Sequence, residues 1–316
     1  MQVAKYAEIE WTRTVGSRGG GSNRYDELPV EKRPGNRFKR LFKGEPGDLG
    51  NFEISVTLTT ASDQVKHYPR HHHIFEQLRM TLIGTPEWTP RTPTPPGWVI
   101  YVGAGTFYGP YDRQAGHEQL HIQFEGANCP PFPGYEALMA ARDALATKGS
   151  FEKGFFVWTD EGGKVHRQDG HEANLQYAIG REVVYPEPRY TAPINMNPEN
   201  FRWLRVADGV DEKELARFTE GETRVAMLRL AAGAAYSFTA LDQRTLLFVY
   251  KGDGTADGSQ LVERDGVLLD PGESVELSAG EDLEFLVVGL PRVARVAAAG
   301  EAAQAQVPSG RVATHA

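Results

Sequence analysis

The residues best suited to chemistry lie in the segment Lys66–Gly84, which reads KHYPRHHHIFEQLRMTLIG. His71 and His73 are two residues apart, so on an extended strand their imidazoles point to the same face, and His72 points to the other. Gln77 follows four residues later with the same parity. Two imidazoles and an amide oxygen on one face could bind a divalent transition metal. The alternative is a cluster of surface histidines that binds metal only adventitiously.

A second group of candidates begins at Tyr108, which could act as a catalytic acid, a substrate anchor or a weak ligand, or could be a plain core tyrosine. In the strand that follows, polar and largely apolar side chains alternate, the polar ones being His117, Gln119, His121 and Gln123. If this polar face is turned inward, His121 could complete a metal site or serve as a general base. If it is turned outward, these side chains are merely solvated.

Most elements that must position these residues are predicted as short strands broken by Pro and Gly. In the first half they are Asn51–Thr60, Phe75–Ile83, Gly97–Val102 and Gln119–Phe124. An Ala/Leu-rich stretch over 135–147 predicts a helix, and 155–167 predicts a hairpin, before a proline-punctuated connector over 185–200. A second β section contains Thr223–Leu230, Thr245–Tyr250, Gly266–Leu269, Ser274–Leu277 and Leu283–Gly289. We therefore expect a fold dominated by β structure.

The histidine segment and the stretch after it resemble the two motifs of the cupin family. The first motif reads His-x-His, three residues, Glu, six residues, Gly, and is similar to His71 through Gly84. The second reads Gly, five residues, Pro-x-Gly, two residues, His, three residues, Asn, and its spacing matches Gly97 through Asp112. This resemblance implies a metal-binding β-barrel of the jelly-roll type. Gln77 stands where cupins usually have Glu, Tyr108 where they have the last His, and Asp112 where they have Asn.

The same spacing in the second β section places Thr239, Leu241, Thr245 and Leu283 at the ligand positions, and none of them binds a divalent metal well. The chain therefore resembles a bicupin, with two barrels joined by a partly helical connector and one candidate site in its N-terminal half. The expected boundaries are an arm over 1–50, a cupin barrel with the candidate metal site over 51–128, a connector over 129–200, a degenerate cupin barrel over 201–296 and a tail over 297–316.

Composition narrows the class of protein. The formal net charge of −8 argues against a nucleic acid or an anionic membrane as the main partner. The single cysteine, Cys129, cannot form an internal disulfide. No signal peptide or long apolar run is visible, which favours a cytoplasmic location. From the resemblance and the exposed strand edges we expect a homodimer.

The expected function is that of a metal-dependent enzyme acting on a small oxygenated organic molecule. His71, His73 and Gln77 are the expected ligands, and Tyr108 and His121 the expected catalytic residues. The resemblance favours a dioxygenase-like reaction, and Fe is the most favoured metal, with Mn, Ni, Zn, Co and Cu as alternatives. The neutral ligands favour a redox-neutral isomerase, lyase or decarboxylase. A non-catalytic binding or structural cupin is the third interpretation.

Overall fold

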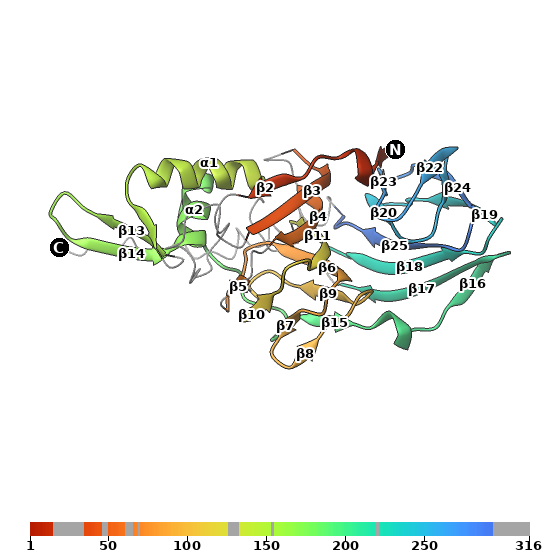
Figure 1. The fold of residues 1–316 in the computed structure, drawn as a ribbon, viewed down its shortest axis with the longest axis horizontal. Coiled ribbons are helices and arrows are strands. Elements are labelled where there is room, and N and C mark those ends of the chain that lie inside the picture. The colour runs from red at the N-terminus through yellow and green to blue at the C-terminus, as the bar shows by residue number, and fades with distance from the viewer. Residues whose placement is uncertain are drawn as a thin grey trace, which may run out of the picture.

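The computed structural model describes residues 1–14, 35–45, 50–60, 66–68, 70–125, 133–152, 155–218 and 221–292. It consists of two β-sandwiches of the jelly-roll type and a partly helical connector that projects from the N-terminal one (Figure 1). Two short 3₁₀ turns, Tyr6–Glu8 and Pro198–Asn200, accompany the strands. The prediction of a fold dominated by β structure is confirmed.

The N-terminal jelly roll has a seven-stranded antiparallel sheet in the order β15-β9-β6-β11-β4-β3-β2, faced by the two-stranded sheet β10-β5, with the hairpin β7-β8 beside them. Its strands are β2 (Thr12–Thr14), β3 (Gly35–Lys43), β4 (Phe52–Thr60), β5 (Lys66–Tyr68), β6 (Glu76–Ile83), β7 (Glu87–Thr89), β8 (Thr92–Pro93), β9 (Val99–Val102), β10 (Tyr111–Arg113), β11 (Glu118–Phe124) and β15 (Ile194–Met196).

The C-terminal jelly roll pairs a seven-stranded sheet, β1-β23-β20-β25-β18-β17-β16, with the four-stranded sheet β19-β24-β21-β22. Its strands are β1 (Gln2–Ala4), β16 (Leu204–Ala207), β17 (Val210–Arg217), β18 (Arg224–Leu230), β19 (Ala235–Thr239), β20 (Thr245–Lys251), β21 (Gly254–Ala256), β22 (Ser259–Leu261), β23 (Gly266–Leu269), β24 (Ser274–Ala279) and β25 (Leu283–Gly289). An apolar cluster fills its interior, and Leu283, at a ligand position of the cupin pattern, is fully buried in that cluster.

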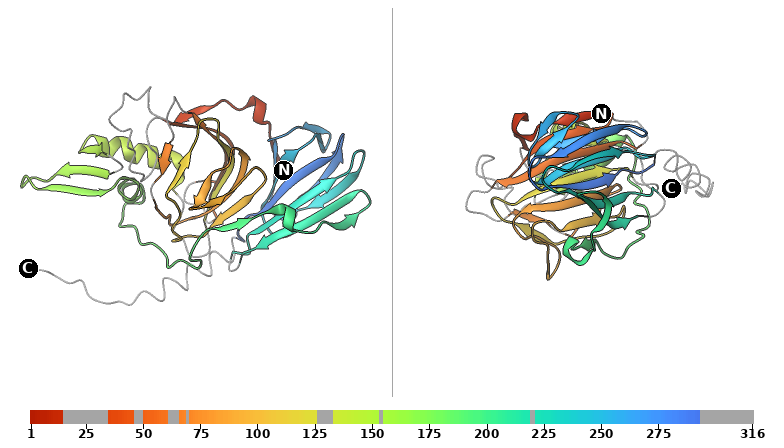
Figure 2. Two further views of the ribbon diagram at one scale, coloured as in Figure 1. Left: turned by 60° about the horizontal axis from the view of Figure 1, so that its bottom comes forward. Right: turned by 90° about the vertical axis from the view of Figure 1, so that its right-hand side faces the viewer.

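The two large sheets pack face to face, as Figure 2 shows from two sides. Each contributes one apolar face to a shared core. The N-terminal sheet supplies Phe52, Ile54, Val56, Leu120, Ile122 and Phe124, and the C-terminal sheet supplies Val225, Met227, Leu246, Phe248, Leu286 and Val288. Each strand therefore has one face committed to the interface between the jelly rolls, and only its other face is turned to the interior of its own sandwich.

Three segments of the predicted arm over 1–50 are regular strands, namely β1, β2 and β3. β1 adds to the C-terminal jelly roll by pairing with β23, so the first residues of the chain reach across the N-terminal unit. β3 is a nine-residue strand with buried Phe38 and Phe42, which pairs with β4. The alternation of apolar and polar side chains along β3 is hard to see in the sequence, because many of its residues are Lys or Arg. The aliphatic parts of these side chains can nevertheless pack along a half-buried strand. The part of the predicted arm over 15–34 lies outside the described residues, as does the tail over 297–316.

The connector is a small layer of its own. Helices α1 (Gly134–Ala146) and α2 (Gly170–Ile179) pack together beside a three-stranded sheet of β12 (Ser150–Glu152), β13 (Phe155–Thr159) and β14 (Val165–Asp169). α1 begins and ends one residue before the predicted bounds 135–147. The Asp169 side chain caps α2 by accepting from the backbone N–H groups of His171 and Glu172. Among the described residues no helix is long and apolar enough to cross a membrane.

Candidate active site

The polar faces of β6 and β11 form the floor of a cavity in the N-terminal jelly roll. In register, Gln77 of β6 lies opposite Gln123 of β11, and Arg79 lies opposite His121. All four are buried. The alternative left open by the sequence is thus resolved by packing: the apolar face of β11 is taken up by the contact with the second jelly roll, so the polar face lines the interior.

The His71–His73 segment is held against the segment that ends at Tyr108. His71 and Tyr108 form an antiparallel bridge in which each backbone N–H donates to the other residue's carbonyl at 3.0 Å. Two residues further along, the N–H of Gly105 donates to the carbonyl of His73 at 2.8 Å. Gly105 has φ +74°, and a Cβ there would collide with the carbonyl oxygen of Pro186, so only glycine fits.

This pairing brings His71, His73 and Tyr108 together as the motif spacing predicts. The Nε2 atom of His71 lies 2.8 Å from the Tyr108 hydroxyl oxygen, and the Nε2 atom of His73 lies 3.0 Å from the same oxygen. Two imidazole nitrogens thus converge on one point in the cavity. His72 points elsewhere, with its ring stacked between Phe107 and Tyr185 at centroid distances of 3.9 and 3.8 Å.

Arg79 connects this cluster to the other predicted residues. Its guanidinium donates to the Tyr108 hydroxyl at 2.9 Å through Nη2, and to Oε1 of Gln77 through both Nε (3.1 Å) and Nη2. His121 lies on the far side of Gln77, with Nε2 3.2 Å from the same Oε1 atom. The five residues Tyr108, His71, His73, Gln77 and His121 therefore belong to one hydrogen-bonded group, with Arg79 inside it.

His171, at the start of α2, reaches the site from the connector. Its Nε2 lies 3.0 Å from Nδ1 of His73, the ring nitrogen that faces away from Tyr108. From its place in the connector sequence, His171 is expected to be a surface residue, and this expectation is wrong, because the residue is buried. The cap at Asp169 fixes the first turn of α2 and so directs the His171 ring onto His73.

Burial sets the protonation states of the site. Desolvation, followed by the proximity of His171, holds the pKa of His73 well below its usual value. Desolvation and the neighbouring Arg79 and Arg113 do the same for the pKa of His121. Burial likewise lowers the pKa of His171 to about 4 and raises the pKa of Tyr108 above its usual value. At neutral pH these imidazoles are neutral and the phenol keeps its proton.

The cavity above this group has a volume of about 330 Å³. Its inner walls are aromatic, with Phe75, Tyr111 and Tyr68 beside the histidines. The connector closes its outer side with Leu138 and Met139 of α1, and with Asn174 of α2. The connector therefore lines the cavity as well as linking the two jelly rolls.

The donor chemistry can be tested against a divalent metal. In an octahedral site with bonds of about 2.1 Å, adjacent donor atoms lie about 3.0 Å apart. The separations of 2.8 and 3.0 Å between the two Nε2 atoms and the Tyr108 oxygen agree with this value. A His73 that donates its Nδ1–H to His171 also keeps Nε2 unprotonated, as a metal ligand requires. His71, His73 and Tyr108 therefore fit such an ion.

Gln77 is a further candidate, and its Oε1 atom accepts from Arg79, as the Tyr108 oxygen does. Within the described part of the chain, no three His, Cys, Asp or Glu residues lie together as a metal-binding group. A third protein ligand beside His71 and His73 would therefore have to be a phenol or an amide. Every candidate donor is neutral, so none would offset the charge of the ion.

Among the comparisons with known proteins, only the one with solved structures bears on the fold. No protein-family model matches the sequence, and no curated protein matches it either. A candidate dioxygenase from Nostoc punctiforme has a similar structure, with a TM-score of 0.57 and 12% identity over 92% of this chain and 82% of that one. HEPD from Streptomyces albus, solved with 2-hydroxyethylphosphonate and Fe(II), gives a TM-score of 0.51 and 11% identity over 98% and 82% of the two chains. These likenesses show a jelly-roll fold shared with the two proteins.

Three residues of the site were missed from the sequence. Arg79 has the same strand parity as Gln77, so the alternation that selected one could have selected the other. Arg113 lies on β10, whose three residues are too short for a pattern. His171 could be found only from the way the connector folds back over the jelly roll, which no local signal reveals.

Proposed function

We propose that the N-terminal jelly roll is the active site of a metal-dependent enzyme that acts on a small oxygenated organic molecule. The observation that carries the proposal is the convergence of the His71 and His73 Nε2 atoms on the Tyr108 hydroxyl beside a cavity of about 330 Å³. His71 and His73 would hold the ion, with Tyr108 or Gln77 as the third protein ligand. A bound divalent ion supplies Lewis-acid polarisation of a substrate oxygen and, when it is redox-active, access to O₂ chemistry.

The protein's own groups prepare the cavity for such chemistry. Tyr108, which keeps its proton, can donate a hydrogen bond to an oxygen on which negative charge develops. His121, which is buried and neutral, can accept a proton from a bound molecule. The connector helices and the aromatic walls exclude bulk water from these groups. His171 acts through His73, whose ring orientation and tautomer it fixes.

Within this class we favour an oxygenase that uses Fe. The support is the family resemblance of the two motifs, together with structural neighbours described as a candidate dioxygenase and as an Fe(II)-containing protein. The donor set favours a second candidate, a redox-neutral isomerase, lyase or decarboxylase. Neutral ligands stabilise a high oxidation state poorly but leave the full charge of the ion available to polarise a carbonyl or carboxylate oxygen.

Metal content tests the proposal. Protein purified without a histidine tag should contain about one equivalent of metal by mass spectrometry, and His71→Ala or His73→Ala should lower this at least tenfold. The matched control is His166→Ala, because His166 lies on the connector hairpin and contacts Asp160 outside the cavity. A metal content that is substoichiometric and unchanged in His71→Ala would overturn the metal site and leave the non-catalytic interpretation.

Oxygen consumption separates the two candidate reactions. With a panel of catechols, diketones and hydroxy acids, an oxygenase should consume O₂ in proportion to product formed. The same turnover in an anaerobic chamber would exclude the oxygenase and favour the redox-neutral reaction.

A further inference from the structure

Two buried guanidinium groups face the cavity, and no carboxylate of the described residues pairs with them. Arg79 and Arg113 are each 4% exposed, and neither forms an ion pair with any residue that the structure describes. Nη1 of Arg79 and Nε of Arg113 are buried and lack a hydrogen-bond partner within that part of the chain. Arginine stays protonated at every accessible pH, so both charges persist inside the protein. A buried, unpaired charge costs several kcal/mol, roughly, unless something compensates it.

Aromatic rings hold these cations in place. The guanidinium of Arg79 lies 4.3 Å from the centre of the Trp88 ring, and that of Arg113 lies 5.0 Å from the same ring. Arg113 also lies 4.8 Å from the ring of Tyr68. Contacts of this kind are worth about 0.5–2 kcal/mol each, which orients the cations but does not neutralise them.

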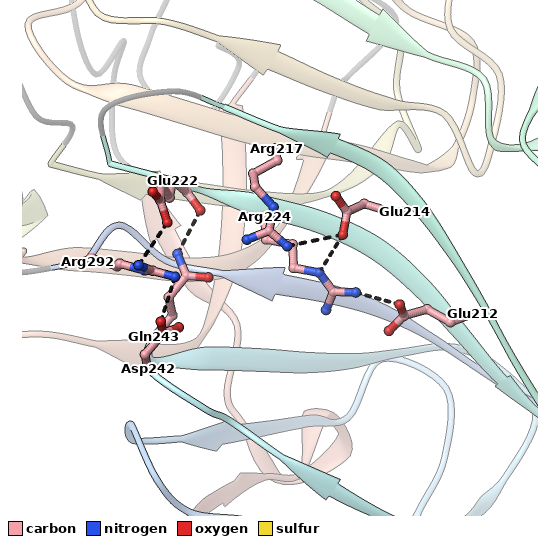
Figure 3. Close-up of polar contacts among 8 residues, drawn as sticks. All are labelled: Glu212, Glu214, Arg217, Glu222, Arg224, Asp242, Gln243 and Arg292. Atoms are coloured by element: carbon pink, nitrogen blue, oxygen red, sulfur yellow. Dashed lines mark hydrogen bonds and ion pairs between the residues drawn. The ribbon is translucent and has the colours of Figure 1, made fainter. Parts of the chain in front are cut away.

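Elsewhere in the same chain arginines are paired with acids. On the C-terminal jelly roll, Arg224 contacts Glu212 at 2.6 Å and Glu214 at 3.0 Å. Figure 3 shows this group beside a second one, in which Arg292 lies 3.0 Å from Glu222 and 2.6 Å from Asp242. Arg79 and Arg113 are buried more deeply than Arg224 and Arg292, yet they form no ion pair with a described residue.

The charge of the cavity is opposite to that of the whole chain. Four arginines line it, namely Arg70, Arg79, Arg113 and Arg142, against two acids, Asp169 and Glu172, while the chain carries −8. Both acids already have other partners, because Asp169 caps α2 and Glu172 accepts from the Gln168 amide. A concave site with low-dielectric walls concentrates the field of its cations and attracts anions.

We infer that the substrate of this cavity is a small organic carboxylate whose charged end lies between Arg79 and Arg113. This inference rests on the proposed function for the identity of the site, but its observations are independent of the metal. The carboxylate would accept charge-assisted hydrogen bonds from the two guanidinium groups. The apolar part would contact the Phe75 and Tyr111 rings, which favours an organic acid over inorganic phosphate.

The test uses metal-free protein, so that it is separate from the test of the metal site. After removal of metal with a chelator, benzoate, its neutral isostere benzamide and inorganic phosphate are each titrated into the full chain by calorimetry. Benzoate should bind at least tenfold more tightly than benzamide or phosphate. Equal binding of benzamide, or tighter binding of phosphate, would overturn the inference.

Variants assign the binding to the two arginines. Arg79→Met should weaken benzoate binding at least tenfold, and Arg113→Met should do the same, so the test survives if one of the two fails to fold. Arg224→Met removes an arginine of the C-terminal jelly roll and should leave the affinity unchanged. Benzoate binding that persists in both cavity variants would contradict the inference even if the protein proves to be a metalloenzyme.

Discussion

The inner face of β11 in the N-terminal jelly roll carries Gln119, His121 and Gln123, whereas the inner face of β25 in the C-terminal one carries Phe285 and Val287. Both sheets present similar apolar outer faces to each other. The two units therefore differ in their interiors rather than in their architecture. In the C-terminal jelly roll the interior is filled by apolar side chains, and such close packing favours stability. In the N-terminal jelly roll the interior contains a polar cavity instead, so the interface with the other jelly roll provides much of its stabilisation.

The largest expected effect comes from truncating the C-terminal interior. Phe285 is fully buried, so Phe285→Ala should lower the free energy of unfolding by about 3–5 kcal/mol. The matched change in the N-terminal jelly roll is at Thr57, which lines the cavity. Thr57→Ala should lower the free energy of unfolding by less than about 1 kcal/mol. Urea unfolding measures both. Equal losses would show that the two interiors contribute alike and would break the comparison.

A change of opposite sign is expected at the unpaired cation of the cavity. Arg79→Met should raise the free energy of unfolding by about 1–4 kcal/mol, because methionine keeps most of the side-chain volume and removes the cost of burying an unpaired charge. Thermal unfolding in the absence of ligand reads this out. A large loss of stability would mean that the hydrogen bonds of Arg79 to Gln77 and Tyr108 outweigh its desolvation.

The pH dependence of stability reports the buried imidazoles of the N-terminal unit. Burial, with a further contribution from Arg113, lowers the pKa of His117 to about 3. Between about pH 3 and the ordinary histidine value near 6.5, the unfolded chain therefore binds a proton that the folded chain does not. Stability from this group rises with pH across that window and is lost on acidification.

Replacement of His117 by leucine should remove this contribution. Near pH 5 the slope of unfolding free energy against pH should fall by about 1.4 kcal/mol per pH unit, with no change of slope above pH 7. Urea titrations at several pH values provide the measurement. An unchanged slope at pH 5 would place the His117 ring in water.

The smallest effect is expected for a paired arginine. Arg224→Met should change the free energy of unfolding by about 1 kcal/mol or less, since its ion pairs with Glu212 and Glu214 lie near solvent and exchange with water at little cost. The difference should shrink further in high salt. A loss of unfolding free energy as large as that of Phe285→Ala would show that Arg224 contributes to stability as a core residue does.

Local patterns in the sequence account for much of the site. Strand parity predicts that Gln77 lies on the same face as His71 and His73. The spacing of the two motifs predicts that Tyr108 lies near His71, where the structure has a β-bridge. The orientation of β11 could not be predicted, because it depends on the other jelly roll covering the apolar face of the sheet. The apolar cluster formed there contains residues more than a hundred positions apart in the sequence, such as Leu120 and Leu286.

Dependence on tertiary contacts also explains why Arg79, Arg113 and His171 could not be predicted as site residues. Nothing local distinguishes a buried, unpaired arginine from a solvated one, since the distinction lies in which acids the folded chain brings near. The connector helix α2 sits over the cavity because of tertiary packing, which no periodicity encodes. The metal ligands and catalytic roles that the sequence suggested stay predictions.

The pairing of β1 with β23 has a consequence for the integrity of the chain. The sheet that completes the C-terminal jelly roll borrows an edge strand from the opposite end of the polypeptide. A single cut in the exposed connector hairpin, between β13 and β14, would therefore leave two fragments that remain associated. The backbone hydrogen bonds between β1 and β23 and the apolar interface between the two large sheets would hold them together. We expect such nicked protein to migrate as one particle until denaturant is added, and the separated pieces to reassemble when mixed.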